Sequence, residues 1–205
     1  MSKQPVAILD IDGVVYPFVT PLSVVASKHT GRPLEHFPEA LVWDFFKDQW
    51  GLSTPEFLEL MAIGAREHGL FGGATDPYPK AVPGIKLLQE LGVHVHFATD
   101  CGDAQDSTGA RANRLAWLAR PDIDLAEIDI TFTADKAAVA LSYIEQGHRV
   151  YAADDRPENY EALAAVGAIA FLQDQKYNEF LIDAQRIHDL VEFAELIKSD
   201  LQALA

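Results

Sequence analysis

The chain has 205 residues, of which 49% are apolar, and its formal net charge is -15 at pH 7. That length suits one well-filled domain with a modest insertion, and no apolar run approaches the roughly twenty residues of a membrane span. The charge disfavours long DNA or RNA as a partner because no cluster of Lys or Arg offsets it, whereas a small phosphate ester stays acceptable.

The first predicted element is the short apolar run Val6–Leu9, which is followed directly by Asp10-Ile11-Asp12-Gly13. The run is too short for a convincing helix and fits a buried parallel strand. The carboxyl ends of such strands are where open α/β sheets bind their ligands, and Asp10 and Asp12 lie on one side of an extended chain. Taken alone, carboxylates at this place are often only turn or N-cap residues.

The next segment, residues 16–79, breaks the alternation of strands and helices and contains no clear strand. Three helices are expected in it, at Pro21–His29, around Leu41–Lys47 and at Pro55–His68. Ser53 or Thr54 is suited to cap the last of them. The segment is therefore interpreted as a small, all-helical insertion, and the main domain is formed by residues 1–15 and 80–205.

Large aromatic side chains are frequent in this insertion: Phe37, Trp43, Phe45, Phe46, Trp50, Phe57 and Phe71. Most of them must form its core, since a unit of this size has few other ways to bury area. The run Trp43-Asp44-Phe45-Phe46 is too dense in rings for all of them to point inward from one helix. At least one of Trp43, Phe45 and Phe46 could therefore stack on a flat base.

From Gly84 onward, strands and helices alternate, which specifies an α/β fold with helices on both faces of a Rossmann-like, doubly wound parallel sheet. The expected helices are 84–90, 110–118, 136–145 and 157–166. The expected strands are 93–98, 128–132, 149–153 and 168–172. The tail from Asp183 to Leu204 reads as one amphipathic helix that packs on the sheet.

Further polar residues stand where these later strands end. Thr99 offers a hydroxyl to a phosphate oxygen, Lys136 opens a helix, and Asp154-Asp155 follow an apolar run. If the two acidic clusters are close, each pair of like charges about 4 Å apart costs up to roughly 4 kcal/mol at an effective dielectric near 20. Only a cation makes that tolerable, so the pattern predicts a metal-dependent phosphoryl-transfer site. In isolation, Lys136 would be read as a solvated helix lysine.

Histidine and cysteine suggest no competing site. Of the seven histidines, only His94 and His96 have a metal-like spacing, and within a strand a hydrogen-bonded structural role is favoured over ligation. Cys101, the only cysteine, cannot form an internal disulfide and is interpreted as a small apolar residue. No N-terminal run resembles a signal peptide, so we expect a cytoplasmic protein without membrane segments.

The order of the motifs resembles that of the haloacid dehalogenase-like superfamily of aspartate-nucleophile phosphohydrolases. Its four motifs are Asp-x-Asp, a strand that ends in Thr or Ser, a Lys and a late acidic pair, and all four occur here in order. In that superfamily an insertion after the first strand is a cap domain, which closes over the site and selects the substrate. The resemblance covers nearly the whole chain and implies a phosphomonoesterase.

The resemblance also implies roles for single residues. Asp10 would be the nucleophile that forms an aspartyl-phosphate, and Asp12 would be the general acid and base. Thr99 would bond a phosphoryl oxygen, and Lys136 would offset charge on Asp10 and on the phosphoryl group. Gly13 would let the chain turn sharply, so that backbone amides face the phosphate.

The implied metal is Mg²⁺, which prefers oxygen ligands. Asp10 would provide a carboxylate oxygen, Asp12 its backbone carbonyl, and one of Asp154 and Asp155 a further carboxylate. Asp155 is favoured as the direct ligand, and Asp154 would then hold a metal-bound water or Lys136.

Three local runs are similar to 5′(3′)-deoxyribonucleotidases: Asp154-Asp155-Arg156-Pro157, Asp48-Gln49-Trp50-Gly51 and Pro77-Tyr78-Pro79-Lys80-Ala81-Val82. The run Arg114-Leu115-Ala116-Trp117 is similar to the helix after the second motif of that group. The chain departs from the group where Asp100, assigned to substrate binding, and Cys101 follow Thr99 in place of Ser-Pro. The similarity implies a nucleoside monophosphatase that prefers deoxynucleotides.

Two alternatives stay open. A polynucleotide 3′-phosphatase has the same acidic pair followed by Arg and a helix, but the acidic charge and the size of the insertion argue against it. A non-catalytic binding or regulatory module would not need the complete set of motif residues. The base, the choice of 5′ or 3′ phosphate and the formation of a homodimer are left undecided by the sequence.

Overall fold

The computed structural model describes residues 3–101, 109–123 and 127–204. Its centre is a six-stranded parallel sheet with the strand order β3-β2-β1-β4-β5-β6. The strands are β1 (Val6–Leu9), β2 (His94–Thr99), β3 (Ile128–Phe132), β4 (Val150–Asp154), β5 (Ile169–Gln173) and β6 (Arg186–Ile187). The predicted doubly wound α/β fold is confirmed, because the chain starts in the middle of the sheet and winds outward to both edges.

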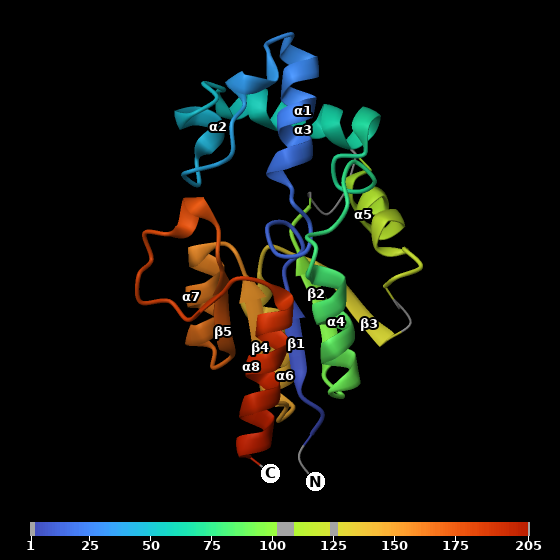
Figure 1. Ribbon diagram of the computed structural model, residues 1–205, viewed down its shortest axis with the longest axis vertical. Helices are drawn as coiled ribbons and strands as arrows, with labels where there is room; N and C mark the ends of the chain where they lie inside the picture. The colour runs from blue at the N-terminus through green and yellow to red at the C-terminus, as the bar shows by residue number, and fades with distance from the viewer. Residues whose placement is uncertain (1–2, 102–108, 124–126, 205) are drawn as a thin grey trace.

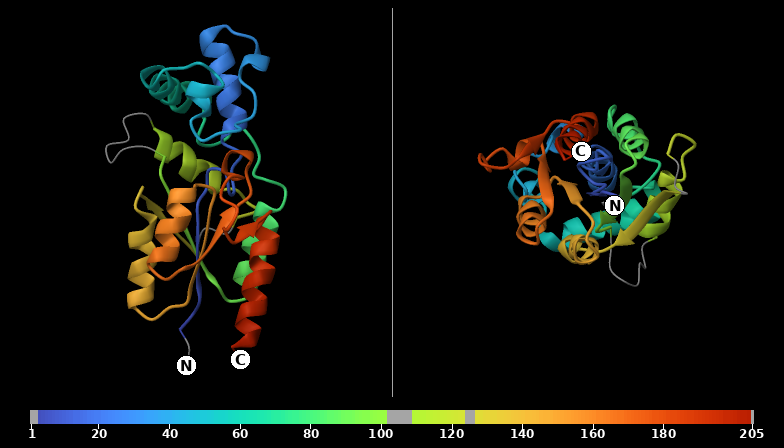
Figure 2. Two further views of the ribbon diagram at one scale, coloured as in Figure 1. Left: turned by 90° about the vertical axis from the view of Figure 1, so that its left-hand side faces the viewer. Right: turned by 90° about the horizontal axis from the view of Figure 1, so that it is seen from below.

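Helices cover both faces of this sheet (Figure 2). On one face lie α4 (Ala81–Glu90) and α8 (Leu190–Ala203), and on the other lie α6 (Lys136–Glu145) and α7 (Pro157–Ala165). Helices α4 and α8 approach each other closely, since a Cβ atom at Gly84 would lie 2.4 Å from the backbone of Leu190. The sheet is thus the middle of three layers.

Strand β1 shows why an uninterrupted apolar run becomes a central strand. Val6 and Ile8 join the apolar cluster on the side of α6 and α7. Ala7 and Leu9 join the cluster on the side of α4 and α8. Because both faces of a parallel strand are covered by helices, every side chain of the run is buried and no polar residue interrupts it.

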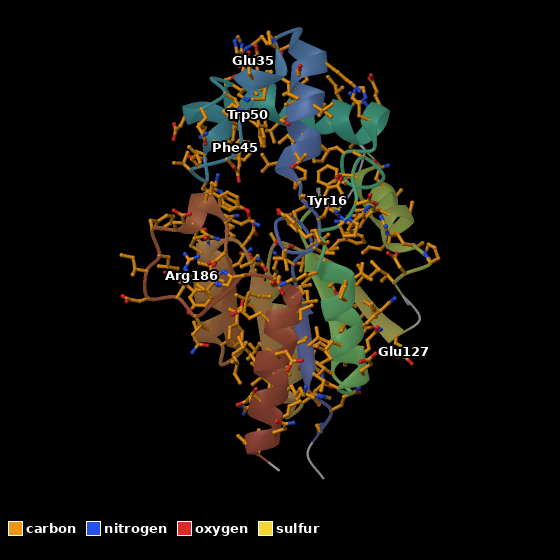
Figure 3. The ribbon with its side chains drawn as sticks, in the orientation of Figure 1. Tyr16, Glu35, Phe45, Trp50, Glu127 and Arg186 are labelled. Carbon is orange, nitrogen blue, oxygen red and sulfur yellow. The ribbon has the colours of Figure 1, made fainter. Side chains whose placement is uncertain are left out.

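Between β1 and α4 the chain forms an all-helical layer over the carboxyl ends of the strands (Figure 1). This helical lobe, residues 19–71, contains α1 (Val19–Thr30), a 3₁₀ turn (Leu34–His36), α2 (Phe45–Asp48) and α3 (Thr54–His68). Ser53 caps α3 and forms the reciprocal capping box with Glu56. Phe45 and Trp50 lie inside the lobe, and Tyr16 lies where the lobe meets the sheet (Figure 3).

The helix predicted around residues 41–47 is shorter than expected and starts only at Phe45. The side chain of Gln49 explains this, because it binds the non-helical segment in front of the helix. Its Oε1 accepts from the amide of Leu41 at 2.7 Å, and its Nε2 donates to the carbonyl of Glu39 at 3.0 Å. These bonds give the backbone groups of Leu41 and Glu39 partners outside a helix, so the helix does not extend toward them.

The single helix predicted for residues 183–204 is wrong in its first part. Arg186 and Ile187 form β6 instead, which pairs with β5. The side chain of Asp189 then accepts from the amides of Val191 and Glu192, both at 3.0 Å, and so fixes the start of α8 at Leu190. The apolar residue that seemed to open the helical stripe, Ile187, is buried at the sheet edge instead.

Both ends of the chain lie at the edge of the sheet that faces away from the helical lobe (Figure 1). Of the helices that the structure describes, none combines the length and the apolar character needed to cross a membrane.

Candidate active site

The predicted site residues from β1, β4 and α6 meet at one edge of the sheet. Strands β1 and β4 are neighbours, so Asp10, just after β1, lies beside Asp154, the last residue of β4. Lys136, at the start of α6, reaches both of them: its Nζ lies 2.7 Å from Oδ2 of Asp10 and 2.6 Å from Oδ2 of Asp154. The sheet topology thus brings together residues that are more than a hundred positions apart in the chain.

Three buried carboxylates form the floor of the site. Oxygen atoms of Asp10, Asp154 and Asp155 all lie within 4.8 Å of one another. Burial raises the pKa of Asp10 from 3.8 to about 7, although Lys136 opposes this change. Burial and the charge of Asp10 raise the pKa of Asp155 well above its ordinary value. The cluster therefore favours either extra protons or a bound cation.

The charge of Lys136 is maintained by the same cluster. Burial of the side chain disfavours the ammonium form, but the carboxylates of Asp10 and Asp154 outweigh burial and raise the pKa of Lys136 above its ordinary value. Lys136 is therefore a buried cation and not a solvated helix lysine.

Asp154 and Asp155 differ in how they are held. Asp154 accepts hydrogen bonds from Lys136, from the amide of Arg156 at 2.9 Å and from the side-chain amide of Asn159 at 3.1 Å. Asp155 accepts from the hydroxyl of Tyr177. Among the described residues, Asp154 therefore has little capacity for another ligand, whereas Oδ1 of Asp155 accepts no hydrogen bond.

Asp12 has a partner that the sequence did not suggest. Its Oδ1 accepts from Nη2 of Arg114, a residue of α5 (Ala110–Leu118) with 0% of its surface exposed. The guanidinium also lies over the ring of Tyr16, 4.8 Å from its centroid. Burial raises the pKa of Asp12, and Arg114 limits that rise. Asp12 and Arg114 are 102 positions apart, so no local pattern could have predicted the pair.

Gly13 is required for two reasons. Its φ of 77° lies in the left-handed region, and a Cβ atom at this position would lie 2.0 Å from Oδ2 of Asp155. Its own amide donates to the carbonyl of Tyr16 at 2.9 Å and so closes the turn. The turn instead leaves space for the carboxylate of Asp155.

Thr99 is the last residue of β2, beside β1, and is completely buried. Its hydroxyl has no hydrogen-bond partner within the described part of the chain. A buried hydroxyl without a partner is costly, but Thr99 is not among the described residues that line the cavity. Asp100, the next residue, is exposed and lines the cavity described below.

A cavity of about 670 Å³ separates the sheet edge from the helical lobe. Its polar wall includes Asp10, Asp12, Lys136 and Asp155. The opposite wall is mostly apolar and comes from the lobe, with Phe37, Trp43, Phe45, Phe46, Phe57 and Phe71 among its residues. A polar floor under an apolar wall is the usual composition of a small-molecule site.

The three rings singled out in the sequence line this cavity in different ways. Phe45 is 9% exposed and packs edge-on against Trp50, with 4.7 Å between ring centroids. Phe46 stacks on Phe57 at 4.1 Å. Trp43 is 41% exposed, although Tyr177 meets its ring edge-on at 5.6 Å and the Arg156 guanidinium lies over it at 5.0 Å. Trp43 is therefore best placed to contact a ligand, and Phe45 mainly belongs to the core of the lobe.

The histidines take the structural role expected of them. His96 pairs with Tyr143 at 3.0 Å and with Thr131 at 2.8 Å, and His94 pairs with Asp129 at 2.9 Å. Cys101 is buried in the apolar cluster of the lobe, in agreement with its interpretation as a small apolar residue.

Comparisons with known proteins place this geometry in a known fold. A hydrolase from Pseudomonas syringae superposes with a TM-score of 0.60 at 14% identity, over 96% of this chain and 99% of that chain. An L-2-haloacid dehalogenase superposes with a TM-score of 0.55 at 10% identity, over 95% and 100%. The chain has the haloacid dehalogenase-like fold. The resemblance drawn from the four motifs is thus confirmed at the level of the fold.

Two further comparisons concern proteins with more specific names. The haloacid dehalogenase-like fold also occurs in a D,D-heptose 1,7-bisphosphate phosphatase from B. bronchiseptica, solved with magnesium and phosphate, which superposes with a TM-score of 0.51 at 16% identity over 96% and 99% of the two chains. A Chlorobaculum tepidum protein named "Putative 5'(3')-deoxyribonucleotidase" is 29% identical over 103 residues. That alignment spans 48% of each protein, about half the length of the relative. No protein-family model matches the chain.

Proposed function

We propose that the protein is a Mg²⁺-dependent phosphomonoesterase that dephosphorylates nucleoside monophosphates, preferably deoxynucleotides, through an aspartyl-phosphate. The observation that carries the proposal is the buried cluster of Asp10, Lys136 and Asp155 below a cavity with an aromatic wall. The name of the Chlorobaculum relative and the magnesium and phosphate in the heptose bisphosphate phosphatase of the same fold agree with it.

The carboxylate cluster fits a divalent cation because its buried like charges lie within 4.8 Å of one another. Asp10, Asp155 and the backbone carbonyl of Asp12 would hold Mg²⁺, while Asp154 stays bound to Lys136 and Asn159. Bound Mg²⁺ would stabilise the negative charge of the phosphoryl oxygens and keep Asp10 ionised.

The protein residues would carry out two transfers. In the first, a carboxylate oxygen of Asp10 forms a bond to phosphorus, the bond from phosphorus to the leaving oxygen breaks, and Asp12 gives its proton to that oxygen. In the second, Asp12 takes a proton from water, whose oxygen attacks phosphorus and releases Asp10 and phosphate. The raised pKa of Asp12 suits a group that must be protonated at the start.

Lys136 and Thr99 would support both transfers. Lys136 is held as a cation beside Asp10, where it offsets negative charge on the group being transferred. Thr99 lies behind the described lining of the cavity, so its hydroxyl would need a local shift to donate to a phosphoryl oxygen. That contact would supply the hydrogen bond that it lacks within the described residues.

The helical lobe would act as the cap that selects the substrate. In this proposal the cap domain comprises residues 16–79, and residues 1–15 and 80–205 form the core domain. Its rings face the carboxylates across the cavity, so a substrate with its phosphate on the floor would extend toward them. A flat base could stack on the exposed ring of Trp43 or on Phe46, whereas a sugar phosphate has no flat aromatic ring.

The proposal is tested by a panel of substrates at equal concentration: deoxynucleoside and ribonucleoside monophosphates, sugar phosphates, p-nitrophenyl phosphate and an oligonucleotide with a 3′-phosphate. Phosphate release is measured with Mg²⁺ and after addition of EDTA. The expected result is the highest kcat/KM for deoxynucleotides and loss of release with EDTA. A higher kcat/KM for the oligonucleotide, or no release from any substrate, would contradict the proposal.

A further inference from the structure

Tyr177 is a buried tyrosine that the proposed mechanism does not use. It lies in a 3₁₀ turn, Lys176–Asn178, shortly after β5, and its hydroxyl donates to Oδ2 of Asp155. The next residue, Asn178, donates from Nδ2 to the backbone carbonyl of Asp155 at 2.7 Å and to that of Gln173 at 2.8 Å. One short turn therefore holds both the side chain and the main chain of Asp155.

The type of donor matters for what Asp155 can do. Asp10 and Asp154 share the positive charge of Lys136, whereas the donor to Asp155 is a neutral phenol. A cationic donor would neutralise the carboxylate and weaken its attraction for a metal ion. A phenol fixes the carboxylate in one orientation and leaves its negative charge in place.

The orientation leaves one carboxylate oxygen available. Tyr177 engages Oδ2, and no hydrogen bond to Oδ1 of Asp155 occurs within the described ranges of the chain. The missing side chain at Gly13 makes this pair feasible, since a Cβ atom there would lie 2.0 Å from Oδ2 of Asp155 and 2.8 Å from the hydroxyl of Tyr177. Gly13 and Tyr177, from two separate segments, thus allow the side chain of Asp155 to adopt this one orientation.

The same turn contacts the helical lobe. The ring of Tyr177 meets the ring of Trp43 edge-on at 5.6 Å, and Lys176 Nζ lies 2.7 Å from Oε2 of Glu39. The ring of Tyr177 is therefore packed from the lobe side while its hydroxyl is bonded on the floor side. These two contacts restrict the position of the hydroxyl.

We propose that Tyr177 is a positioning residue that orients Asp155 so that its free oxygen faces the cation. The inference deepens the proposed function and rests on it. Tyr177 also lines the cavity, but its hydroxyl is directed to Asp155. Its role in the reaction would therefore be exerted through Asp155, as groups behind metal ligands do when they fix the direction of a ligand.

The test is the substitution Tyr177→Phe, which removes the hydroxyl and keeps the ring against Trp43. Mg²⁺ is titrated into metal-free protein by calorimetry without substrate, and the expected loss of affinity is about 10- to 100-fold. The matched control is Tyr151→Phe, because the Tyr151 hydroxyl also donates to a carboxylate, that of Asp200, away from the cavity. Its Mg²⁺ affinity should stay within about threefold of the unmodified protein.

Kinetic measurements and the same substitution in a second variant distinguish a positioning role of Tyr177 from a general disturbance of the site. In Tyr177→Phe, kcat at low Mg²⁺ should fall and should recover as Mg²⁺ is raised, with little change in KM for the nucleotide. In the Asp155→Asn background, Tyr177→Phe should change Mg²⁺ affinity no further, because the ligand is already altered. An equal additional loss in that background would overturn the inference.

The remaining outcomes separate a failure of the role of Tyr177 from a failure of the proposed function on which it rests. Unchanged Mg²⁺ affinity in Tyr177→Phe, with tight binding by the unmodified protein, overturns the role of Tyr177 and leaves the proposed function intact. Absence of Mg²⁺ binding by the unmodified protein overturns the proposed function, and the inference with it. The melting temperature of the metal-free variants, measured in parallel, reports any loss of folding.

Discussion

The sheet edge and the helical lobe face each other across one cavity, but different interactions stabilise each of the two regions internally. At the edge, buried charges are tied to specific partners, Lys136 to Asp10 and Asp154, and Arg114 to Asp12. In the lobe, apolar rings pack on one another. The difference suggests that changes at the edge should affect every substrate alike. Changes to an exposed ring of the lobe should affect substrates selectively.

The largest effect is expected from Asp10→Asn. The amide has nearly the volume of the carboxylate but is a poor nucleophile, so kcat should fall by at least about a thousandfold for every substrate. Steady-state phosphate release measures the loss, and circular dichroism checks that the fold is kept. The control is Asp76→Asn, a change at an exposed aspartate outside the cavity lining. Turnover within about tenfold of the unmodified protein would remove Asp10 from its role.

The second prediction concerns stability at the edge. Lys136→Met leaves Asp10 and Asp154 buried without their shared cation, which should lower the free energy of unfolding by about 3–5 kcal/mol. The exposed pair of Lys80 and Asp189 provides the control, and Lys80→Met should cost at most about 1 kcal/mol. Urea unfolding in EDTA measures both. Equal losses in the two variants would mean that the cluster is not held by charge.

The third prediction compares two rings of the lobe. Phe45→Ala should lower the free energy of unfolding by about 3–5 kcal/mol and weaken all substrates together, because Phe45 is part of the lobe core. Trp43→Ala should cost about 1–3 kcal/mol in kcat/KM for nucleotides and much less for a small sugar phosphate, which has no aromatic ring. Kinetics with both substrates, together with melting curves, separate the two effects.

The rings would turn out to be purely structural if Trp43→Ala, Phe45→Ala and Phe46→Ala all weakened every substrate to the same degree. The proposed preference for nucleotides would then lose its main support within the cavity. The phosphomonoesterase proposal would be unaffected, because it depends on the sheet edge.

The smallest expected effect is a pH dependence of stability in the metal-free protein. Burial raises the pKa of Asp10 from 3.8 to about 7, so the folded state binds a proton more tightly than the unfolded state does. This group therefore stabilises the folded protein at low pH, and its contribution is lost as the pH rises through about 7. The melting temperature in EDTA should rise as the pH falls from about 8 to about 5.

Asp10→Asn is the control for this titration, because burial also raises the pKa values of Asp12 and Asp155 in the folded protein. The rise in melting temperature should be smaller in the variant. Identical pH profiles would show that Asp10 titrates at its ordinary pKa in the folded protein.

The sequence predicted the sheet edge well because each of its signals is local. An apolar run followed by Asp10, and another followed by Asp154, indicates a strand end without knowledge of the rest of the chain. The order of these motifs then indicated a haloacid dehalogenase-like, doubly wound parallel sheet, and the observed strand order confirms that fold. Lys136 was identifiable because it follows a strand and opens a helix.

The residues that support the edge could not be predicted in this way. Arg114 and Tyr177 lie in segments whose local pattern indicates only a helix and a loop, and their partners Asp12 and Asp155 are brought near by the tertiary fold. Trp43 lies in the turn before α2, and its exposure could not be inferred from the density of rings in its sequence. Asp189, by contrast, is a typical N-cap residue and could have indicated that α8 starts at Leu190. The apolar residues before and after it suggested one continuous helix instead.

Both chain ends lie at the edge of the sheet opposite the helical lobe, while the cavity lies beneath the lobe (Figure 1). An affinity tag or a fluorescent protein attached to either end would therefore extend away from the cavity. The protein could be immobilised on a surface through one end, with the other end still carrying a reporter. Substrate would still diffuse to the cavity from the open solution on the opposite side.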